Sequence, residues 1–114
     1  MVERRRYKRR NLLAEVRIRP REGGLWLQAV LTNIHRGGVG VYAMGALKKK
    51  EKVSVRITYL EDGRMREVEE IPGIVRWVQP IGESSAAGIM FDAVIGPKTF
   101  PFLARCLKYI RKAD

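Results

Sequence analysis

Residues 25–43, LWLQAVLTNIHRGGVGVYA, contain the hairpin around which we expect the fold to be organised. Residues 25–32 are apolar on both faces, as expected for a strand in the middle of a sheet. The following six residues, NIHRGG at 33–38, are rich in the types that favour turns. We therefore predict two strands, 25–32 and 39–43, joined by a turn over 33–38.

Alternating apolar and polar side chains predict further strands on both sides of this hairpin. Ala14, Val16 and Ile18 alternate with charged residues upstream, and 53–60 alternates downstream. The Asp62-Gly63 pair is the strongest short hairpin signal in the chain. The remaining predicted segments are a turn at 20–24, a polar edge strand at 64–70, a bend at 72–73, and strands at 74–78 and 87–91 joined by a turn at 79–85. Seven short strands with such frequent turns predict an all-β fold, a closed or nearly closed antiparallel barrel.

The period changes to that of a helix only near the end of the chain, where we expect a helix over 98–112. Its apolar stripe consists of Phe102, Leu103, Cys106, Leu107 and Ile110. Thr99 is the candidate cap, with Pro101 in the first turn. The stripe is expected to cover one end of the barrel; the alternative is a face that contacts a partner protein or a second copy in a homodimer.

Length and composition indicate one globular domain over 1–114, with a basic arm at 1–12 and the barrel at 13–92. The lone Cys106 excludes an internal disulfide framework and fits a reducing compartment. No stretch approaches the ~20 apolar residues of a membrane span, and no apolar signal core follows the basic start. We therefore expect a cytoplasmic protein without membrane insertion.

The net charge of +11 favours a polyanionic or phosphorylated partner. The charge is concentrated in an arm, a loop and the C-terminal segment: Arg4, Arg5, Arg6, Lys8, Arg9 and Arg10; Lys48, Lys49, Lys50 and Lys52; and Lys98, Arg105, Lys108, Arg111 and Lys112. The planar fork of arginine matches phosphate oxygens and the Hoogsteen edge of guanine, and it stacks on purines. Taken alone, the arm is either a phosphate clamp or a solvated basic tail.

Residues for catalysis or for a metal centre are scarce. His35 is the only histidine, and no serine or cysteine can be assigned to it as a partner. One histidine and one cysteine cannot supply a zinc site. Glu61 and Asp62 are expected to be solvated carboxylates on a hairpin tip. We therefore predict neither an enzyme nor a resident cofactor or metal.

The segment 33–38 has side chains suited to a nucleobase. Asn33 presents both a hydrogen-bond donor and an acceptor, and Gly37 and Gly38 permit positive φ and close approach of a ligand to the backbone. The same residues are also common in ordinary β-turns. By itself, the segment does not distinguish a nucleobase-binding site from an ordinary β-turn.

Together, the arm and this segment resemble the PilZ family. The family signature is Arg-x-x-x-Arg, often preceded by another Arg, and later in the chain Asp/Asn-x-Ser-x-x-Gly. RRRYKR at 4–9 and NIHRGG at 33–38 supply the two parts, and GGVGV at 37–41, VRW at 75–77 and GIMF at 88–91 are similar to the family's strands. The resemblance implies a six- to seven-stranded antiparallel barrel with a C-terminal α-helix, and cyclic di-GMP as the ligand.

The resemblance also implies roles for individual residues. Arg5 and Arg9 would grip phosphates and guanine, with Arg4 assisting. Asn33 and the side chain at position 35 would face a guanine, while Gly38 keeps the turn open. Arg6 to Arg10 is the alternative register of the arginine clamp. Further candidates are Arg6, Arg10, Arg36, Gly37, Arg76 and Trp77.

One residue departs from the family pattern, because His35 stands where the family has serine. A neutral imidazole still offers one donor and one acceptor. The substitution leaves two hypotheses: binding with altered geometry, or a degenerate member that serves as a protein–protein adaptor without nucleotide. Trp77 likewise has two interpretations, stacking on guanine or, as the preferred one, packing in the barrel.

As a ligand sensor, the chain would order its arm around cyclic di-GMP and signal to an unidentified effector protein. A small nucleic-acid-binding barrel is the last alternative, suggested by charge alone. Such barrels interleave exposed aromatic side chains with basic ones. Trp26, Tyr59 and Phe91 are instead predicted to face the core, which disfavours nucleic acid.

Overall fold

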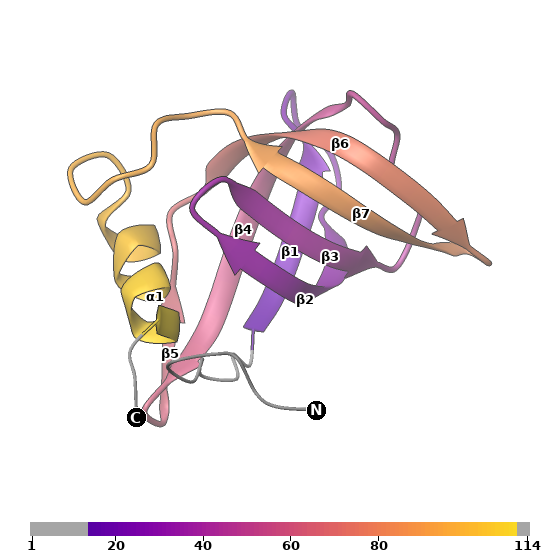
Figure 1. The fold of residues 1–114 in the computed structure, drawn as a ribbon. Coiled ribbons are helices and arrows are strands. Elements are labelled where there is room, and N and C mark those ends of the chain that lie inside the picture. The colour runs from indigo at the N-terminus through magenta and orange to yellow at the C-terminus, as the bar shows by residue number, and fades with distance from the viewer. Residues whose placement is uncertain (1–13, 112–114) are drawn as a thin grey trace, which may run out of the picture.

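The computed structural model describes residues 14–111, which form seven strands and one helix (Figure 1). The elements are β1 (Ala14–Pro20), β2 (Leu27–His35), β3 (Gly38–Ala43), β4 (Lys52–Glu61), β5 (Arg64–Glu67), β6 (Ile71–Ile81), β7 (Ser84–Phe91) and α1 (Pro101–Arg111). Six strands close into an antiparallel barrel, and β5 pairs only with β4. The predicted all-β barrel with a C-terminal helix is confirmed.

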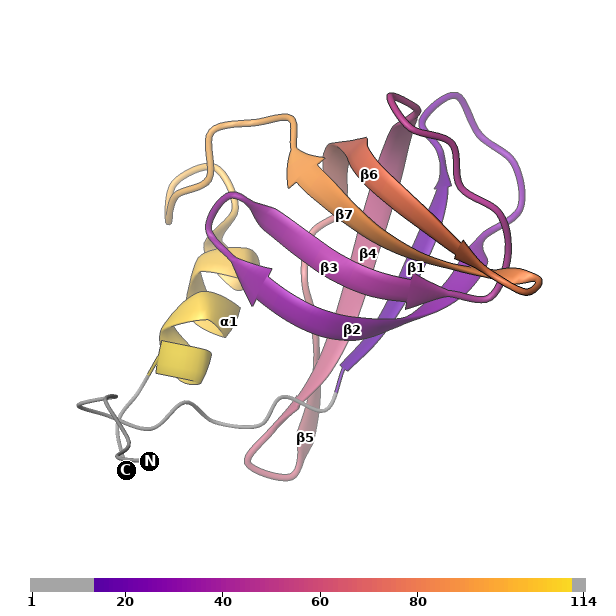
Figure 2. The same ribbon diagram turned by 45° about the vertical axis from the view of Figure 1, so that its right-hand side comes forward.

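β1 closes the barrel because it pairs on both sides. Its ladder with β4 runs from Ala14 opposite Tyr59 to Pro20 opposite Val53, and its other edge pairs with β2. The remaining strands complete the circle in the order β2-β3-β7-β6-β4. α1 packs at one end of this barrel, beside β4 and β5 (Figure 2). No helix within residues 14–111 combines the length and apolar character needed to cross a bilayer.

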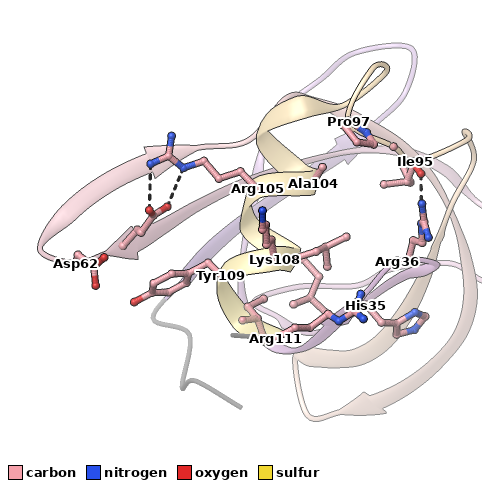
Figure 3. Close-up of a pocket in the computed structure, with 15 residues that line it drawn as sticks. His35, Arg36, Asp62, Ile95, Pro97, Ala104, Arg105, Lys108, Tyr109 and Arg111 are labelled. Atoms are coloured by element: carbon pink, nitrogen blue, oxygen red, sulfur yellow. Dashed lines mark hydrogen bonds and ion pairs between the residues drawn. The ribbon is translucent and has the colours of Figure 1, made fainter. Parts of the chain in front are cut away.

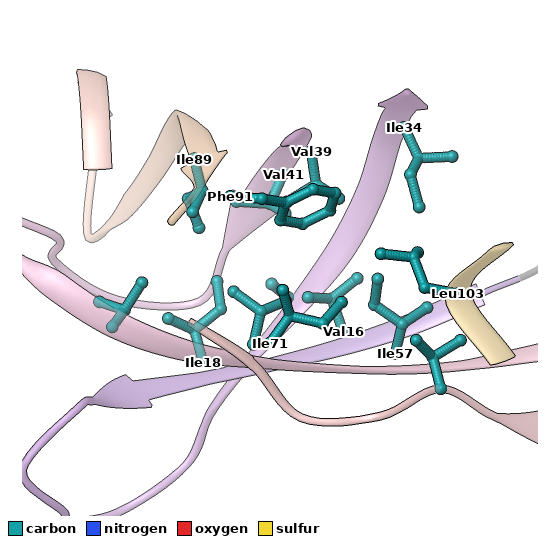
Figure 4. Packing of buried hydrophobic residues seen from close by; sticks show 14 of the residues in the cluster. Val16, Ile18, Ile34, Val39, Val41, Ile57, Ile71, Ile89, Phe91 and Leu103 are labelled. Atoms are coloured by element: carbon teal, nitrogen blue, oxygen red, sulfur yellow. The ribbon is translucent and has the colours of Figure 1, made fainter. Parts of the chain in front are cut away.

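Inward-facing aliphatic side chains from the barrel strands and from α1 form one core (Figure 4). Val16 and Ile18 are buried in β1, as the alternation predicts. The helix contributes Leu103, Cys106 and Ile110, whereas Phe102 of the predicted stripe is 55% exposed. Burial raises the pKa of the Cys106 thiol to about 12, so this cysteine stays protonated near neutral pH.

Two hairpins are tighter than the sequence suggests. β2 continues to His35 and β3 begins at Gly38, so the turn predicted over 33–38 consists only of Arg36 and Gly37. β6 and β7 likewise leave only Gly82 and Glu83 between them. Polar side chains on the solvent face of a strand resemble turn residues in the sequence, which explains both errors. Asp62 and Gly63 have the positive φ angles, 49° and 82°, of the predicted hairpin turn.

Carboxylates from the β4–β6 region hold α1 against the barrel. The amides of Phe102 and Leu103 donate to the two carboxylate oxygens of Glu69, at 2.7 and 2.9 Å. Glu69 therefore satisfies amides that no helical carbonyl reaches, and its charge suits the positive end of the helix dipole. The predicted Thr99 cap is wrong, because the Thr99 hydroxyl donates to the carbonyls of Val94 and Gly96 instead.

Glu61 makes a second attachment of α1. Arg105 donates from Nε and Nη2 to its two carboxylate oxygens, at 3.2 and 3.1 Å, and the Tyr59 hydroxyl donates at 3.1 Å. The hydrogen bonds from Arg105 lower the pKa of Glu61. Burial raises the pKa of Tyr59, so its hydroxyl remains a donor. Glu61 is therefore a structural ion-pair residue rather than the solvated hairpin carboxylate that we predicted.

Of the three aromatic residues predicted to face the core, Tyr59 and Phe91 are buried and Trp26 is not. The Trp26 ring lies outside the barrel with the guanidinium carbons of Arg19 and Arg56 at 4.4 and 5.5 Å from its centroid. These arginines pair with Glu70 and Glu67, at 3.7 and 3.8 Å respectively. Trp26 therefore belongs to a stacked surface network whose arginine charges are already paired.

Replacing Glu69 with alanine tests this capping arrangement. Glu69→Ala leaves two helix amides without their carboxylate, and we expect it to lower the free energy of unfolding by about 0.5–2 kcal/mol. Urea unfolding of the full chain measures this value. Glu83→Ala, which removes an exposed carboxylate in the β6–β7 turn, is the control and should change stability much less. Equal effects of both substitutions would contradict the capping role.

Candidate functional site

Four residues lie side by side across the outer face of the barrel, one on each of four neighbouring strands. Asn33 in β2 pairs with Gly40 in β3, Gly40 pairs with Gly88 in β7, and Gly88 pairs with Trp77 in β6. We call Asn33, Gly40, Gly88 and Trp77 the outer row. Its two central members have no side chains, and the amide of Asn33 and the indole of Trp77 fill the space above them.

Two β-bulges turn the ends of the outer row toward solvent. The β2–β3 register shifts between Leu31 and Asn33, and the β6–β7 register shifts between Val75 and Trp77. Leu31 and Val75 face inward, so unbroken alternation would also point Asn33 and Trp77 inward. The extra residue of each bulge reverses the alternation. Asn33 is therefore exposed, and Trp77 is half exposed rather than packed in the barrel as preferred from the sequence.

The glycines of this region are required for close packing. A Cβ at Gly40 would lie 2.7 Å from the side-chain oxygen of Asn33, and a Cβ at Gly88 would collide with the indole Nε1 of Trp77. A Cβ at Gly38 would collide with the carbonyl oxygen of Ile89 in β7. Gly37 and Gly38 do not adopt the positive φ suggested by the sequence. Gly40 and Gly88 were missed as site residues, although glycine inside a predicted strand signals such close approach.

His35 closes the hairpin through its own ring. The amide of Gly37 donates to His35 Nδ1 at 2.9 Å. Because Nδ1 accepts this bond, the neutral ring carries its proton on Nε2. A serine hydroxyl can accept the corresponding bond from the residue two positions on. His35 thus retains a turn-closing acceptor at the family's serine position and has an additional donor at Nε2.

The side chains of Arg76 and Arg36 contact different parts of the molecule. Arg76 is the extra residue of the β6 bulge, and its Nη1 contacts Met90 Sδ at 3.2 Å. Arg36 lies in the β2–β3 turn, where its Nε donates to the carbonyl of Ile95 at 3.4 Å. Arg36 also lines a cavity of about 1050 Å³ between the β2–β3 turn, the β4–β5 hairpin and α1 (Figure 3). The candidate residues are therefore divided between the outer face and this cavity.

The candidate arginines of the arm, Arg4, Arg5, Arg6, Arg9 and Arg10, lie outside the described residues. Their point of attachment is nevertheless fixed. β1 begins at Ala14, and its second residue, Glu15, pairs with Val30 in β2. β2 continues beyond this pairing to Asn33 and His35. Arg9 precedes Ala14 by five residues, a reach of at most about 16–18 Å. The arm is thus attached close to the exposed half of β2.

Comparison with known proteins identifies the family and supports the fold. The family model described as PilZ domain matches residues 3–107. Among solved structures, the inhibitor of motility of Bacillus subtilis, MotI/DgrA, is similar with a TM-score of 0.58 and 22% identity over 94% of this chain and 51% of that chain. The chain spans about half the length of this neighbour, and the likeness is one of fold. No curated protein sequence matches.

The different environments of Gly37 and Gly38 give a direct test of the hairpin packing. Gly38→Ala places a methyl group against backbone, which cannot move aside, and should destabilise the chain by about 1–3 kcal/mol or more. Gly37→Ala places its methyl group about 3.0 Å from His35 Cε1, an exposed side chain that can rotate. Urea unfolding should rank Gly38→Ala as clearly the more damaging. The reverse order would contradict the packing described for β3 and β7.

Proposed function

The chain belongs to the PilZ domain family, a family of binding and adaptor modules rather than enzymes, and from this premise we propose that it binds cyclic di-GMP. The observation that carries the proposal is the outer row beside the attachment point of the arginine arm. We further propose that the ligand orders the arm and changes the surface offered to a partner protein. This mechanism requires a ligand site and an arm within reach of each other, as the attachment at Ala14 allows.

The outer row has the chemistry needed to hold a guanine base. The Asn33 amide offers a donor and an acceptor to a base edge. The half-exposed indole of Trp77 is a planar surface suited to stacking. Because Gly40 and Gly88 have no side chains, the Asn33 amide and the Trp77 indole lie directly over them, and a base could stack on the outward face of the indole. Arg76 lies next to Trp77 in the chain and is exposed, so its guanidinium is a further candidate for the ligand.

In this proposal, the arm supplies the phosphate contacts. Arg5 and Arg9 bind phosphates and guanine, with Arg4 assisting; Arg6 and Arg10 are the alternative pair. Six basic residues among the first ten repel one another. The two phosphates of the ligand offset that repulsion, and the arm then closes over the outer row. Ligand binding would in this way shift the arm toward one arrangement.

Calorimetry with arm variants tests the arginine clamp. We expect heat on titration of cyclic di-GMP into the full chain at low salt. Arg5→Ala and Arg9→Ala each remove charge-assisted hydrogen bonds of about 1.5–3 kcal/mol, which corresponds to a loss of affinity of roughly tenfold to a hundredfold. Lys49→Ala, which removes the same charge from the exposed loop between β3 and β4, should have little effect. No heat from the wild-type chain at high-micromolar ligand would refute nucleotide binding.

His35→Ser separates this proposal from the degenerate adaptor that binds no nucleotide. If His35 Nε2 donates to the ligand, His35→Ser keeps a donor and the turn-closing acceptor, and its affinity should stay within about tenfold of wild type. His35→Ala should bind more weakly than either. The same titrations decide the rival hypothesis, which predicts no binding by wild type and a gain of binding in His35→Ser.

A further inference from the structure

The cavity beside α1 is a second surface, distinct from the outer row. It lies between the C-terminal half of the helix, the β2–β3 turn, and the β4–β5 hairpin (Figure 3). Its apolar lining comes from β2, from the loop before α1 and from α1: the core residues Ile34, Ile95 and Ile110, which are 6–7% exposed, and the partly exposed Leu107 and Tyr109. A cavity of about 1050 Å³ with such a lining can accept several side chains of another molecule. Of the residues that line this cavity, the proposed nucleotide site uses only His35.

The residues that surround the apolar lining are mainly basic. Arg36 comes from the β2–β3 turn, and Lys108 and Arg111 come from the exposed side of α1. Neither Lys108 nor Arg111 makes an ion pair within residues 14–111. Two carboxylates in this range line the cavity: Glu61 is paired with Arg105, which leaves Asp62 as one negative charge against the three positive charges of Arg36, Lys108 and Arg111. Helix-dipole compensation accounts for Lys108 and Arg111, but it does not account for Arg36. The cavity thus combines an apolar lining with uncompensated positive charge.

This combination selects among possible occupants. The chain's own arm carries six basic residues and one acid, Glu3, so it is repelled by the basic rim. A second copy carries a net charge of +11, and the exposed carboxylates of its residues 14–111 outside the ion pairs, Glu15, Glu22, Asp62 and Glu83, are spread over one strand and three separate turns, so this part of the chain presents no acidic cluster to the cavity. A nucleotide would find the phenol ring of Tyr109 among mainly aliphatic side chains, and competition between nucleotide and peptide tests this alternative. Apolar side chains flanked by carboxylates meet both requirements of the cavity.

We propose that the cavity docks an acidic amphipathic segment of a partner protein, with aliphatic side chains on the lining and carboxylates against Arg36, Lys108 and Arg111. The inference rests on the proposed adaptor function and names the chemistry of its partner. The β2–β3 hairpin would link the two surfaces, because Asn33 faces the outer row and Arg36 faces the cavity. Docking itself needs no nucleotide, so it can be tested separately.

A designed peptide provides the probe. A fluorescein-labelled helix of about 18 residues, five turns at ~3.6 residues each, carries leucines on one face and glutamates on the other. We expect the full chain to bind it without nucleotide, as measured by fluorescence anisotropy. The double variant Lys108→Glu/Arg111→Glu should weaken binding by at least about tenfold. The matched variant Lys48→Glu/Lys49→Glu makes the same charge change on the exposed β3–β4 loop and should alter affinity less than about twofold.

Three further measurements secure the interpretation. Arg36→Glu acts from a different element and should also weaken binding, so the result does not depend on α1 alone. A scrambled peptide of equal composition should bind at least about tenfold more weakly than the amphipathic one. Equal losses in the two double variants, or equal affinity for both peptides, would overturn the proposal, because they indicate unspecific charge attraction.

Nucleotide titrations of the same variants distinguish the two proposals. Loss of cyclic di-GMP binding in Lys108→Glu/Arg111→Glu, together with competition between nucleotide and peptide, would assign the cavity to the nucleotide and overturn the docking proposal. Peptide binding by a chain that gives no heat with cyclic di-GMP would support docking while refuting the proposed ligand. Failure of the amphipathic peptide to bind wild type would overturn the docking proposal alone.

Discussion

Two β-bulges decide what the outer face of this barrel presents. Strict alternation would bury the side chains of Asn33 and Trp77 on the inner face of a tightly packed barrel. The register shifts in β2 and β6 turn both side chains outward, at the two ends of a row whose centre is Gly40 and Gly88. The glycines are required in turn, because the two side chains lie over the backbone at these positions. Bulges and glycines therefore form one interdependent arrangement.

Closure of the barrel also places the start of β1 and the helix α1 near the β2–β3 hairpin. Because β1 pairs with both β2 and β4, the start of the described chain is fixed beside the exposed half of β2. The end of β4 carries Glu61, whose ion pair with Arg105 holds α1 across the barrel end. The β2–β3 turn thus lies between the outer row and a cavity bordered by the helix.

Much of this arrangement could be predicted from the sequence, since alternation and turn residues indicate seven strands and a helix. The incorrect predictions concern which side chains face the core and where particular strands begin and end. Alternation cannot reveal a bulge, so Trp77 was expected inside the barrel. Trp26 was expected in the core because its segment is apolar. The arginines that it contacts instead, Arg19 and Arg56, lie on other strands, and the sequence does not show that they meet its ring. The cap of α1 comes from Glu69, far from the helix in the chain, whereas sequence reasoning considers neighbours such as Thr99.

We propose that cyclic di-GMP binds to the outer row, beside the point where the arm joins β1. Two-dimensional NMR of the ¹⁵N-labelled full chain during titration with the ligand tests it most directly. We expect the largest chemical-shift changes at the indole N–H of Trp77 and at the backbone amides of Asn33, Gly40 and Gly88. Saturable shifts confined to other surfaces, such as the β3–β4 loop or the cavity beside α1, would contradict it.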